Sequence, residues 1–371
     1  MKGDLPIISN RAVLAGTAWR LFAIAIIPGL FPALSIAQQR AKSFVYNDDK
    51  TLGYLEYLPP GYADETNLYP VLIYLHGGGE GGDGSPEQLE KLKSWGPPRH
   101  IQEGHDMCFT VNGKEECFIV ISPQIVTQID NFTYYVPYVI NHILNGPENY
   151  KADPDRIYLT GLSRGGFGTY DFAASFLNEP NKLAAIAPMS AWAEEAYDGC
   201  VIAKRKIPVW AFHGRKDTVI PYSQGLIAFN EIKFCTSPEP EAELILTTYE
   251  DRYHDAWIPG YDPTHTYHNP NVYEWLLMHT RPDPGIVTAI DETIGHPFAI
   301  HPNPAIESIS LPEEQVAAGS RITMFDAHGA VITDIICEDD QLDISSLSPG
   351  IYILRIISPS GTIATERLVK L

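Results

Sequence analysis

The sequence is poor in basic residues, with 26 lysines and arginines against 46 aspartates and glutamates and a net charge of −20. Nucleic acids and anionic membrane surfaces repel such a chain unless a basic stripe intervenes, and the sequence has no such stripe. It also lacks tandem repeats and low-complexity tracts. With 44% hydrophobic and 19% charged residues in 371 positions, the composition indicates a folded protein with one large core and room for an accessory module.

A long uninterrupted apolar run is absent as well. Residues 21–34 are apolar but contain two prolines and a glycine, and they fall short of the ~20 residues that span a bilayer. Basic residues precede this run and small residues follow it at 35–37, which is typical of a secretory signal peptide. We therefore expect residues 1–37 to be a signal peptide, with a membrane anchor as the alternative, and no stable membrane span in the mature chain.

Cysteine is scarce, with five residues, and export makes each a candidate for a disulfide. Cys108 and Cys117 flank Asn112-Gly113, a strong signal for a two-residue hairpin turn. Counting outward from the turn pairs the two cysteines at a non-hydrogen-bonded position, where side chains approach most closely. We predict a disulfide there. By elimination, Cys200 and Cys235 are the candidates for a second bridge, which leaves the last cysteine unpaired.

Apolar runs of strand length alternate with helical patterns between residues 43 and 281. Because strands that alternate with helices form βαβ units, the pattern predicts an α/β fold with a mostly parallel central sheet flanked by helices. A leading hairpin is expected at 43–46 and 53–58. Further strands are expected at residues 70–75, 118–122, 156–160, 183–188, 207–212 and 243–249, and helices at about 86–94, 133–146, 165–178, 223–234 and 270–280.

The composition changes after Thr280. Proline-rich and glycine-containing residues at 282–296 indicate a linker. Beyond it, segments of alternating hydrophobicity at 321–325, 330–335 and 351–356 are separated by turn signals. We therefore expect four parts, a signal peptide at 1–37, an α/β domain at 38–281, a linker at 282–296 and a small all-β, sandwich-like domain at 297–371.

The chain is organised around Gly161-x-Ser163-x-Gly165, which follows one expected strand and precedes an expected helix. A serine on a sharp strand-to-helix turn needs small neighbours, because the strained backbone brings the two elements close together. The pattern is that of a nucleophile elbow. An ordinary Gly/Ser turn is the alternative, which the downstream sequence disfavours.

In an α/β hydrolase the acid and the histidine follow later strands, in the order Ser, Asp or Glu, His. Asp217 follows the strand expected at 207–212, and His254 follows the strand expected at 243–249. We predict that His254 removes the proton of Ser163 and that Asp217 holds the histidine tautomer. The alternatives are that Asp217 is a turn residue and His254 a surface histidine. Two other aspartates, at 251 and 255, are too close to His254 in sequence to come from another strand.

A glycine-rich turn follows the strand expected at 70–75. Backbone N–H groups in such a turn converge on an anion, and the absence of a Gly-Lys-Ser/Thr ending excludes a phosphate loop. We predict an oxyanion hole formed by the N–H of Arg164 and that of Gly78 or Gly79, with His76 holding the loop. The chemistry so defined needs no cofactor.

Two tryptophans, Trp192 and Trp257, lie in loops beyond strand ends and are candidates for stacking on substrate rings, with loop packing as the alternative. Asp262, His265 and His268 cluster in one loop. A metal site there is the alternative that we weigh, but loop histidines without further ligands are usually unliganded. We expect no metal.

Several motifs together resemble the secreted α/β-hydrolase esterases of the polyhydroxybutyrate-depolymerase-like, feruloyl-esterase-like and "predicted peptidase" group. The resemblance covers roughly residues 43–281. It implies an exported serine carboxylic-ester hydrolase, with a serine peptidase and a non-catalytic surface-binding protein as alternatives. The motifs are Leu75-His-Gly-Gly-Gly-Glu-Gly-Gly, Gly161-Leu-Ser-Arg-Gly-Gly-Phe-Gly-Thr-Tyr, Pro208-Val-Trp-Ala-Phe-His-Gly-Arg-Lys-Asp and His254-Asp-Ala-Trp.

The C-terminal module resembles the sorting domain of the type IX secretion system of Bacteroidetes-type bacteria. Its marks are Pro302-Asn303-Pro304, the segment 342–352 and the terminal residues 367–371. The resemblance implies delivery by that machinery and a secreted or surface-attached protein. An Ig-like carbohydrate-binding or adhesive module is the alternative.

The stretch from 188 to 207 is too short to hold a substantial lid between two strands that bear on the site. An open site favours short or polymer-linked esters over long acyl chains, which need a deep apolar cover. We therefore expect short acyl or hydroxycinnamoyl esters, such as feruloyl esters, carried on polysaccharide.

Overall fold

The structure is a computed structural model. It describes residues 38–47, 50–63, 67–126, 131–178, 181–193, 197–281, 300, 302–311, 320–326, 331–336, 341–357 and 363–371. The expected signal peptide at 1–37, the expected linker at 282–296 and Cys337 lie outside these residues. Within them, no helix is long and apolar enough to cross a membrane.

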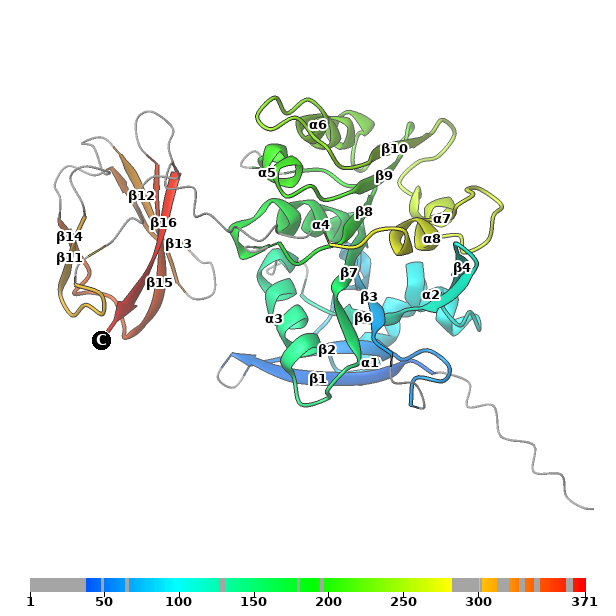
Figure 1. Ribbon diagram of the computed structural model, residues 1–371, viewed down its shortest axis with the longest axis horizontal. Coiled ribbons are helices and arrows are strands. Elements are labelled where there is room, and N and C mark those ends of the chain that lie inside the picture. Colours follow the sequence, from blue (N-terminus) through cyan, green and yellow to red (C-terminus); the bar gives the residue numbers. More distant parts are fainter. Residues whose placement is uncertain are drawn as a thin grey trace, which may run out of the picture. The chain divides into compact units, whose positions relative to one another are not determined.

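An eight-stranded sheet organises the chain before residue 282 (Figure 1), in the order β1-β2-β6-β3-β7-β8-β9-β10. Neighbours from β6 to β10 run parallel, whereas β2 pairs antiparallel with both β1 and β6. Every expected strand of this sheet is present, so the predicted α/β class is confirmed. The bounds are β1 Arg40–Asn47, β2 Lys50–Tyr57, β3 Tyr69–Leu75, β6 Ile119–Pro123, β7 Ala152–Leu162, β8 Ala185–Met189, β9 Val209–Gly214 and β10 Leu244–Tyr249.

The central strands are apolar throughout because both faces of the sheet are covered. Along β3, Val71 and Ile73 face one apolar core, whereas Leu72 and Tyr74 face the other. Figure 1 shows α3, α4 and α5 on one side of the sheet and α2, α7 and α8 on the other. The helices are α1 Pro86–Leu89, α2 Gly96–Gln102, α3 Phe132–Asn145, α4 Arg164–Ala174, α5 Gly199–Lys204, α6 Tyr222–Lys233, α7 Trp257–Gly260 and α8 Val272–Leu277.

Most of the expected helices are present with changed ends. The helix expected at 86–94 is α1 followed by a 3₁₀ turn, η2 (Glu90–Ser94). The one expected at 270–280 is the shorter α8, which begins after a capping box formed by Asn271 and Glu274. Three short helices, α2, α5 and α7, were not predicted.

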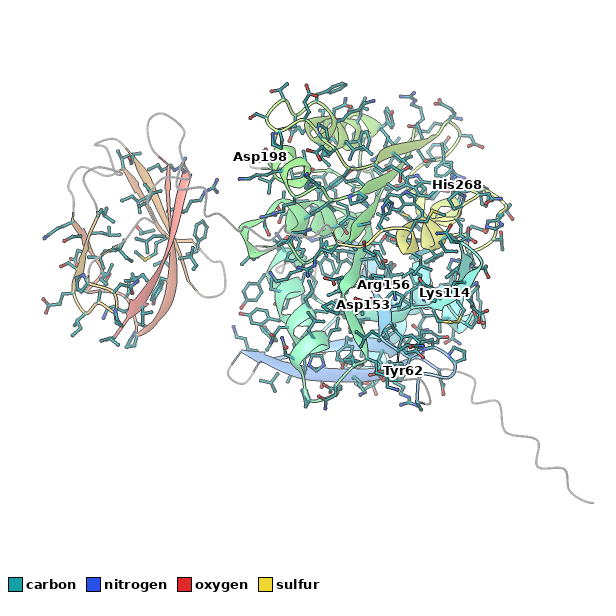
Figure 2. All side chains as sticks on the ribbon, viewed as in Figure 1. Tyr62, Lys114, Asp153, Arg156, Asp198 and His268 are labelled. Atoms are coloured by element: carbon teal, nitrogen blue, oxygen red, sulfur yellow. A yellow bond between two sulfur atoms is a disulfide. The ribbon has the colours of Figure 1, made fainter. Side chains whose placement is uncertain are left out.

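Both expected disulfides are present. Strands β4 (Cys108–Val111) and β5 (Lys114–Cys117) pair in the predicted register, and the Cα atoms of Cys108 and Cys117 lie 4.0 Å apart. A second bridge joins Cys200 to Cys235 at a Cα distance of 5.3 Å. It ties α5 to the end of α6. The side chain of Asp198 (Figure 2) caps α5 by accepting the N–H of Cys200 at 3.0 Å.

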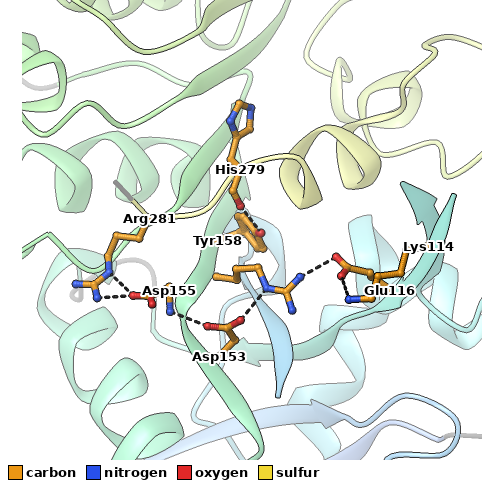
Figure 3. Close-up of polar contacts among 8 residues, drawn as sticks. Lys114, Glu116, Asp153, Asp155, Tyr158, His279 and Arg281 are labelled. Carbon is orange, nitrogen blue, oxygen red and sulfur yellow. Dashed lines mark hydrogen bonds and ion pairs between the residues drawn. The ribbon is translucent and has the colours of Figure 1, made fainter. Parts of the chain in front are cut away.

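Ion pairs fasten peripheral segments to the start of β7 (Figure 3). Arg156 lies between Glu116 of the hairpin at 2.7 Å and Asp153 at 2.8 Å. Arg281 pairs with the carboxylate of Asp155, and its backbone N–H donates to the carbonyl of the same residue at 2.7 Å. The last described residue before 282 is therefore held against the amino end of β7.

The C-terminal region is all-β, as predicted. Its four-stranded antiparallel sheet has the order β13-β12-β15-β16, and β11 pairs with β14. Leu354 and Leu368 are fully buried in its apolar core. The strands are β11 Ser308–Ser310, β12 Arg321–Asp326, β13 Val331–Ile336, β14 Gln341–Asp343, β15 Gly350–Ile357 and β16 Ile363–Lys370.

The two disulfides should contribute unequally to stability. The Cys200–Cys235 bridge spans a sequence separation of 35 and the Cys108–Cys117 bridge one of 9. Loop-closure entropy then gives about 4 and about 3 kcal/mol, respectively. Urea unfolding of the two paired Cys→Ala variants should show the larger loss for Cys200 and Cys235. The reverse order would contradict the entropic account.

Candidate active site

Ser163 sits on a sharp turn between β7 and α4, with a strained backbone of positive φ, at φ 51° and ψ −115°. Its N–H donates to the carbonyl of Met189 at 2.8 Å. A Cβ at Gly165 would lie 2.0 Å from the carbonyl oxygen of Leu75, and one at Gly161 would lie 2.4 Å from the backbone of Gly165. The two glycines are therefore required by the close approach of β3, β7 and α4, as the elbow pattern predicted.

The three residues predicted as a triad come together at the carboxyl ends of β7, β9 and β10. His254 Nε2 lies 2.9 Å from Ser163 Oγ, and its Nδ1 lies 2.7 Å from Asp217 Oδ2. A carboxylate accepts only, so Nδ1 carries the proton and Nε2 accepts from the serine hydroxyl. The Asp217 side chain is fully buried, whereas that of His254 is 17% exposed. This arrangement lets the histidine take a proton from the serine.

Asp217 is oriented by its own turn. Its Oδ1 accepts the backbone N–H groups of Val219 and Ile220, both at 2.9 Å, which leaves Oδ2 for His254. The alternative acids are placed elsewhere. Asp255 pairs with an arginine three residues before it, and Asp251 is exposed.

The glycine turn after β3 forms a 3₁₀ turn, η1 (Gly78–Glu80). A Cβ at Gly77 would lie 2.6 Å from the Leu162 side chain, so the turn packs beside the residue that precedes the nucleophile. Open space surrounds Gly78 and Gly79, where an added Cβ meets no atom within 4 Å. Arg164 is the first residue of α4, and helix N-termini favour negative charge. The structure thus brings the predicted oxyanion donors to the same region.

His76 holds the glycine turn in place through two hydrogen bonds of its ring. It is fully buried, its Nδ1–H donates to the carbonyl of Gly77 at 2.7 Å, and its Nε2 accepts the N–H of Ile125 at 3.1 Å. Burial lowers the pKa of His76 to about 4. The ring is therefore neutral and ties the turn after β3 to the segment after β6.

Gln124 was not predicted, although it braces the same turn. Its amide Nε2 donates to the carbonyls of Glu80 and Gln88 at 2.8 and 2.7 Å, and its Oε1 accepts the N–H of Gly84 at 3.1 Å. The signal in the sequence is a polar residue that directly follows a buried strand, β6. Burial also raises the pKa of the Glu80 carboxyl.

The two tryptophans differ in their exposure. Trp257 is 8% exposed and meets the His254 ring edge-to-face, with centroids 5.0 Å apart. Trp192 is half-buried and stacks on Phe167 with centroids 4.9 Å apart. Trp192 therefore lies beside α4 and Trp257 beside His254. Most of the Trp257 side chain is buried by packing.

The side chains of Asp262, His265 and His268 do not form one cluster, and the two histidines contact different partners. His265 pairs with Glu274 at 2.7 Å, and His268 (Figure 2) contacts the hydroxyl of Tyr249 at 2.5 Å. In the described part of the chain, no three histidine, cysteine or acidic side chains are grouped to hold a metal ion.

A mostly parallel sheet of this order, with serine, aspartate and histidine at successive carboxyl ends, defines the α/β-hydrolase fold. Residues 299–370 match the family of secretion system C-terminal sorting domains. The chain therefore carries a C-terminal signal for export to the cell exterior or cell surface.

Over 232 residues the chain is 28% identical to a bifunctional acetylxylan esterase/xylanase of Neocallimastix patriciarum. The match covers 59% of this chain and 27% of that protein, so the chain spans about a quarter of its relative's length.

Solved structures with a similar fold include a thermostable esterase, at 23% identity and a TM-score of 0.48, with 66% of this chain and 63% of that one covered. An acylaminoacyl peptidase of Pyrococcus horikoshii shares 16% identity at a TM-score of 0.43, covering 67% and 43%. A feruloyl esterase module of Clostridium thermocellum shares 17% at 0.42, covering 61% and 84%.

Substitution of the elbow glycine should unfold the turn. In Gly165→Ala the new methyl group lies 2.0 Å from the Leu75 carbonyl, so we expect a loss of roughly 3 kcal/mol or more in the free energy of unfolding. Gly79→Ala adds the same methyl group in open space and serves as the matched control, with unchanged stability in thermal or urea unfolding. Equal stability of the two variants would contradict the close approach.

His76 should make stability depend on pH. Its pKa rises from about 4 in the folded protein to the ordinary 6.5 on unfolding, so the unfolded chain binds the proton first. Stability is then lost as the pH falls from about 6.5 towards 4, by about 2 kcal/mol at pH 5 relative to pH 7.5. Urea unfolding of wild type and His76→Gln at both pH values should show this additional loss in the wild type alone. Equal losses of stability in wild type and His76→Gln between the two pH values would contradict this prediction.

Proposed function

We propose that this protein is an exported serine hydrolase that cleaves carboxylic esters. Ser163 acts as the nucleophile, His254 as general base and acid, and Asp217 as the residue that holds His254. The observation that carries the proposal is the unbroken hydrogen-bond chain from Ser163 Oγ through His254 to Asp217, presented on a strained elbow.

The chemistry follows from these positions. His254 Nε2 removes the proton as Ser163 Oγ attacks the ester carbonyl, and the backbone N–H groups of Arg164 and of Gly78 or Gly79 stabilise the oxyanion by roughly 3–4 kcal/mol each. His254 then protonates the leaving alcohol. Water attacks the acyl-enzyme by the same route and releases the acid.

The substrates we propose are short acyl or feruloyl esters carried on polysaccharide. The connection from Met189 at the end of β8 to Val209 at the start of β9 holds the short α5 in place of a substantial lid. The similarity to an acetylxylan esterase/xylanase supports an acetyl ester on a polysaccharide. The half-exposed Trp192 offers a ring beside α4 on which a sugar or phenolic group can stack.

We further propose that residues 38–281 form the catalytic domain and that residues 297–371 act only in sorting, through the type IX secretion machinery. The signal peptide at 1–37 and the linker at 282–296 complete this arrangement. The match at 299–370 supports it, and so does the anchoring of Arg281 on Asp155.

Turnover of p-nitrophenyl esters tests the proposal. Wild type should hydrolyse the acetyl ester, Ser163→Ala should lose activity by at least about a thousandfold, and kcat/KM should fall steeply beyond about four acyl carbons. Full activity of Ser163→Ala would reject the triad, and a preference for long chains would reject the open site. Faster cleavage of peptide p-nitroanilides than of esters would identify a peptidase instead.

A further inference from the structure

A second histidine, His213, lies against the carboxylate of Asp217. It is near the end of β9 and 2% exposed. Its Nε2 lies 2.9 Å from the carbonyl oxygen of Ile220 and 3.5 Å from Asp217 Oδ2. Because a carbonyl oxygen only accepts, Nε2 carries the ring proton.

The backbone of Ile220 also links His213 to Asp217, because it hydrogen-bonds to both side chains. The N–H of Ile220 donates to Asp217 Oδ1 at 2.9 Å, while its carbonyl accepts from His213. The histidine thus fixes the turn that presents donors to one carboxylate oxygen. The protonated Nε2 also lies 3.5 Å from the other oxygen, the one that accepts from His254, so the partial positive charge of the N–H group is close to that oxygen.

Helix α6 holds the imidazole in place. A Cβ at Gly225 would lie 2.2 Å from His213 Nδ1, and the Tyr222 ring meets the imidazole edge-to-face at 5.8 Å. The titratable side chains that act electrostatically on the ring are Asp217 and His254, and the aromatic ring of Tyr222 packs against it. Burial lowers the pKa of His213 and keeps the ring neutral.

Neutrality has a chemical consequence. A positive charge 3.5 Å from Asp217 Oδ2 would form an ion pair with that oxygen and compete with the imidazolium that develops on His254. A neutral N–H orients the carboxylate without this competition.

We propose that His213 is a positioning residue of the hydrolase, which holds Asp217 through the Ile220 peptide and moderates the negative potential that Asp217 exerts on His254. The inference rests on the proposed function, because it concerns the same reaction. It adds His213, acting through the Ile220 peptide, to the residues that position Asp217 for its contact with His254.

Two amide variants test the proposal. In His213→Gln the side-chain Nε2 can reach the Ile220 carbonyl, whereas in His213→Asn the shorter amide reaches only the position of Nδ1. We expect Gln to stay within about threefold of wild-type kcat and Asn to lose on the order of tenfold or more, with KM nearly unchanged. The acid limb of the kcat/KM pH profile should move up by roughly half a pH unit in Asn, because the carboxylate without the nearby imidazole N–H attracts positive charge within the triad more strongly.

The control is His142→Asn. His142 lies on α3, is also buried and hydrogen-bonds to the hydroxyl of Tyr54 on β2 at 3.0 Å. This variant should lower the melting temperature and leave the pH profile in place. Matching kcat values and acid limbs for the two folded His213 variants would overturn the inference.

Different results would reject the proposed hydrolase function and the proposed role of His213. An active Ser163→Ala variant rejects the proposed function itself. An inactive Ser163→Ala variant, together with a folded His213→Asn variant of wild-type kcat and pH profile, rejects the role of His213 alone. If His213→Asn does not fold, Gly225→Ala displaces the imidazole from the other side and must shift the acid limb for the inference to stand.

Discussion

The contact between the end of β3 and the start of α4 is the constraint on which the candidate site depends. The carbonyl oxygen of Leu75 lies where any side chain at position 165 would begin. Two residues before Gly165, the backbone of Ser163 has a positive φ of 51°. The close approach of β3 and α4 also brings the glycine turn that follows β3 beside Ser163, so one steric condition bears on both the proposed nucleophile and the proposed oxyanion donors.

Neutral buried side chains then hold the polar parts of the site. His76 and Gln124 fix the glycine turn, and His213 contacts the turn of Asp217. Burial keeps the imidazoles of His76 and His213 uncharged. Each therefore stabilises its turn through hydrogen bonds and not through charge.

The parts that the sequence predicted depend on local patterns. The strand at 70–75 is a continuous apolar run, and the hairpin register follows from the Asn112-Gly113 turn. Helix α2 was missed because it begins Gly-Pro-Pro and is too short for a clear periodicity. The contacts of Gln124 join its side chain to backbone groups about 40 residues away, which become neighbours only when the sheet is assembled. The contact of His213 with Ile220 is local, but it depends on the turn conformation, which no spacing in the sequence specifies.

The sequence also left the role of Trp257 open between stacking on substrate and packing. The structure buries most of the ring against His254 and its surroundings. Which surface of an aromatic side chain stays exposed depends on the loops that cover it, and these are not encoded in spacing or motif.

The anchoring of Arg281 on Asp155 determines where the polypeptide departs from the hydrolase body. Asp155 belongs to the amino end of β7 and Ser163 follows its carboxyl end, so almost the whole strand separates them, on the order of 25 Å at ~3.3 Å per residue. The chain therefore leaves the α/β part of the molecule at the end of the sheet opposite to Ser163, and a tether that begins there is attached at the far end of the sheet from the proposed nucleophile.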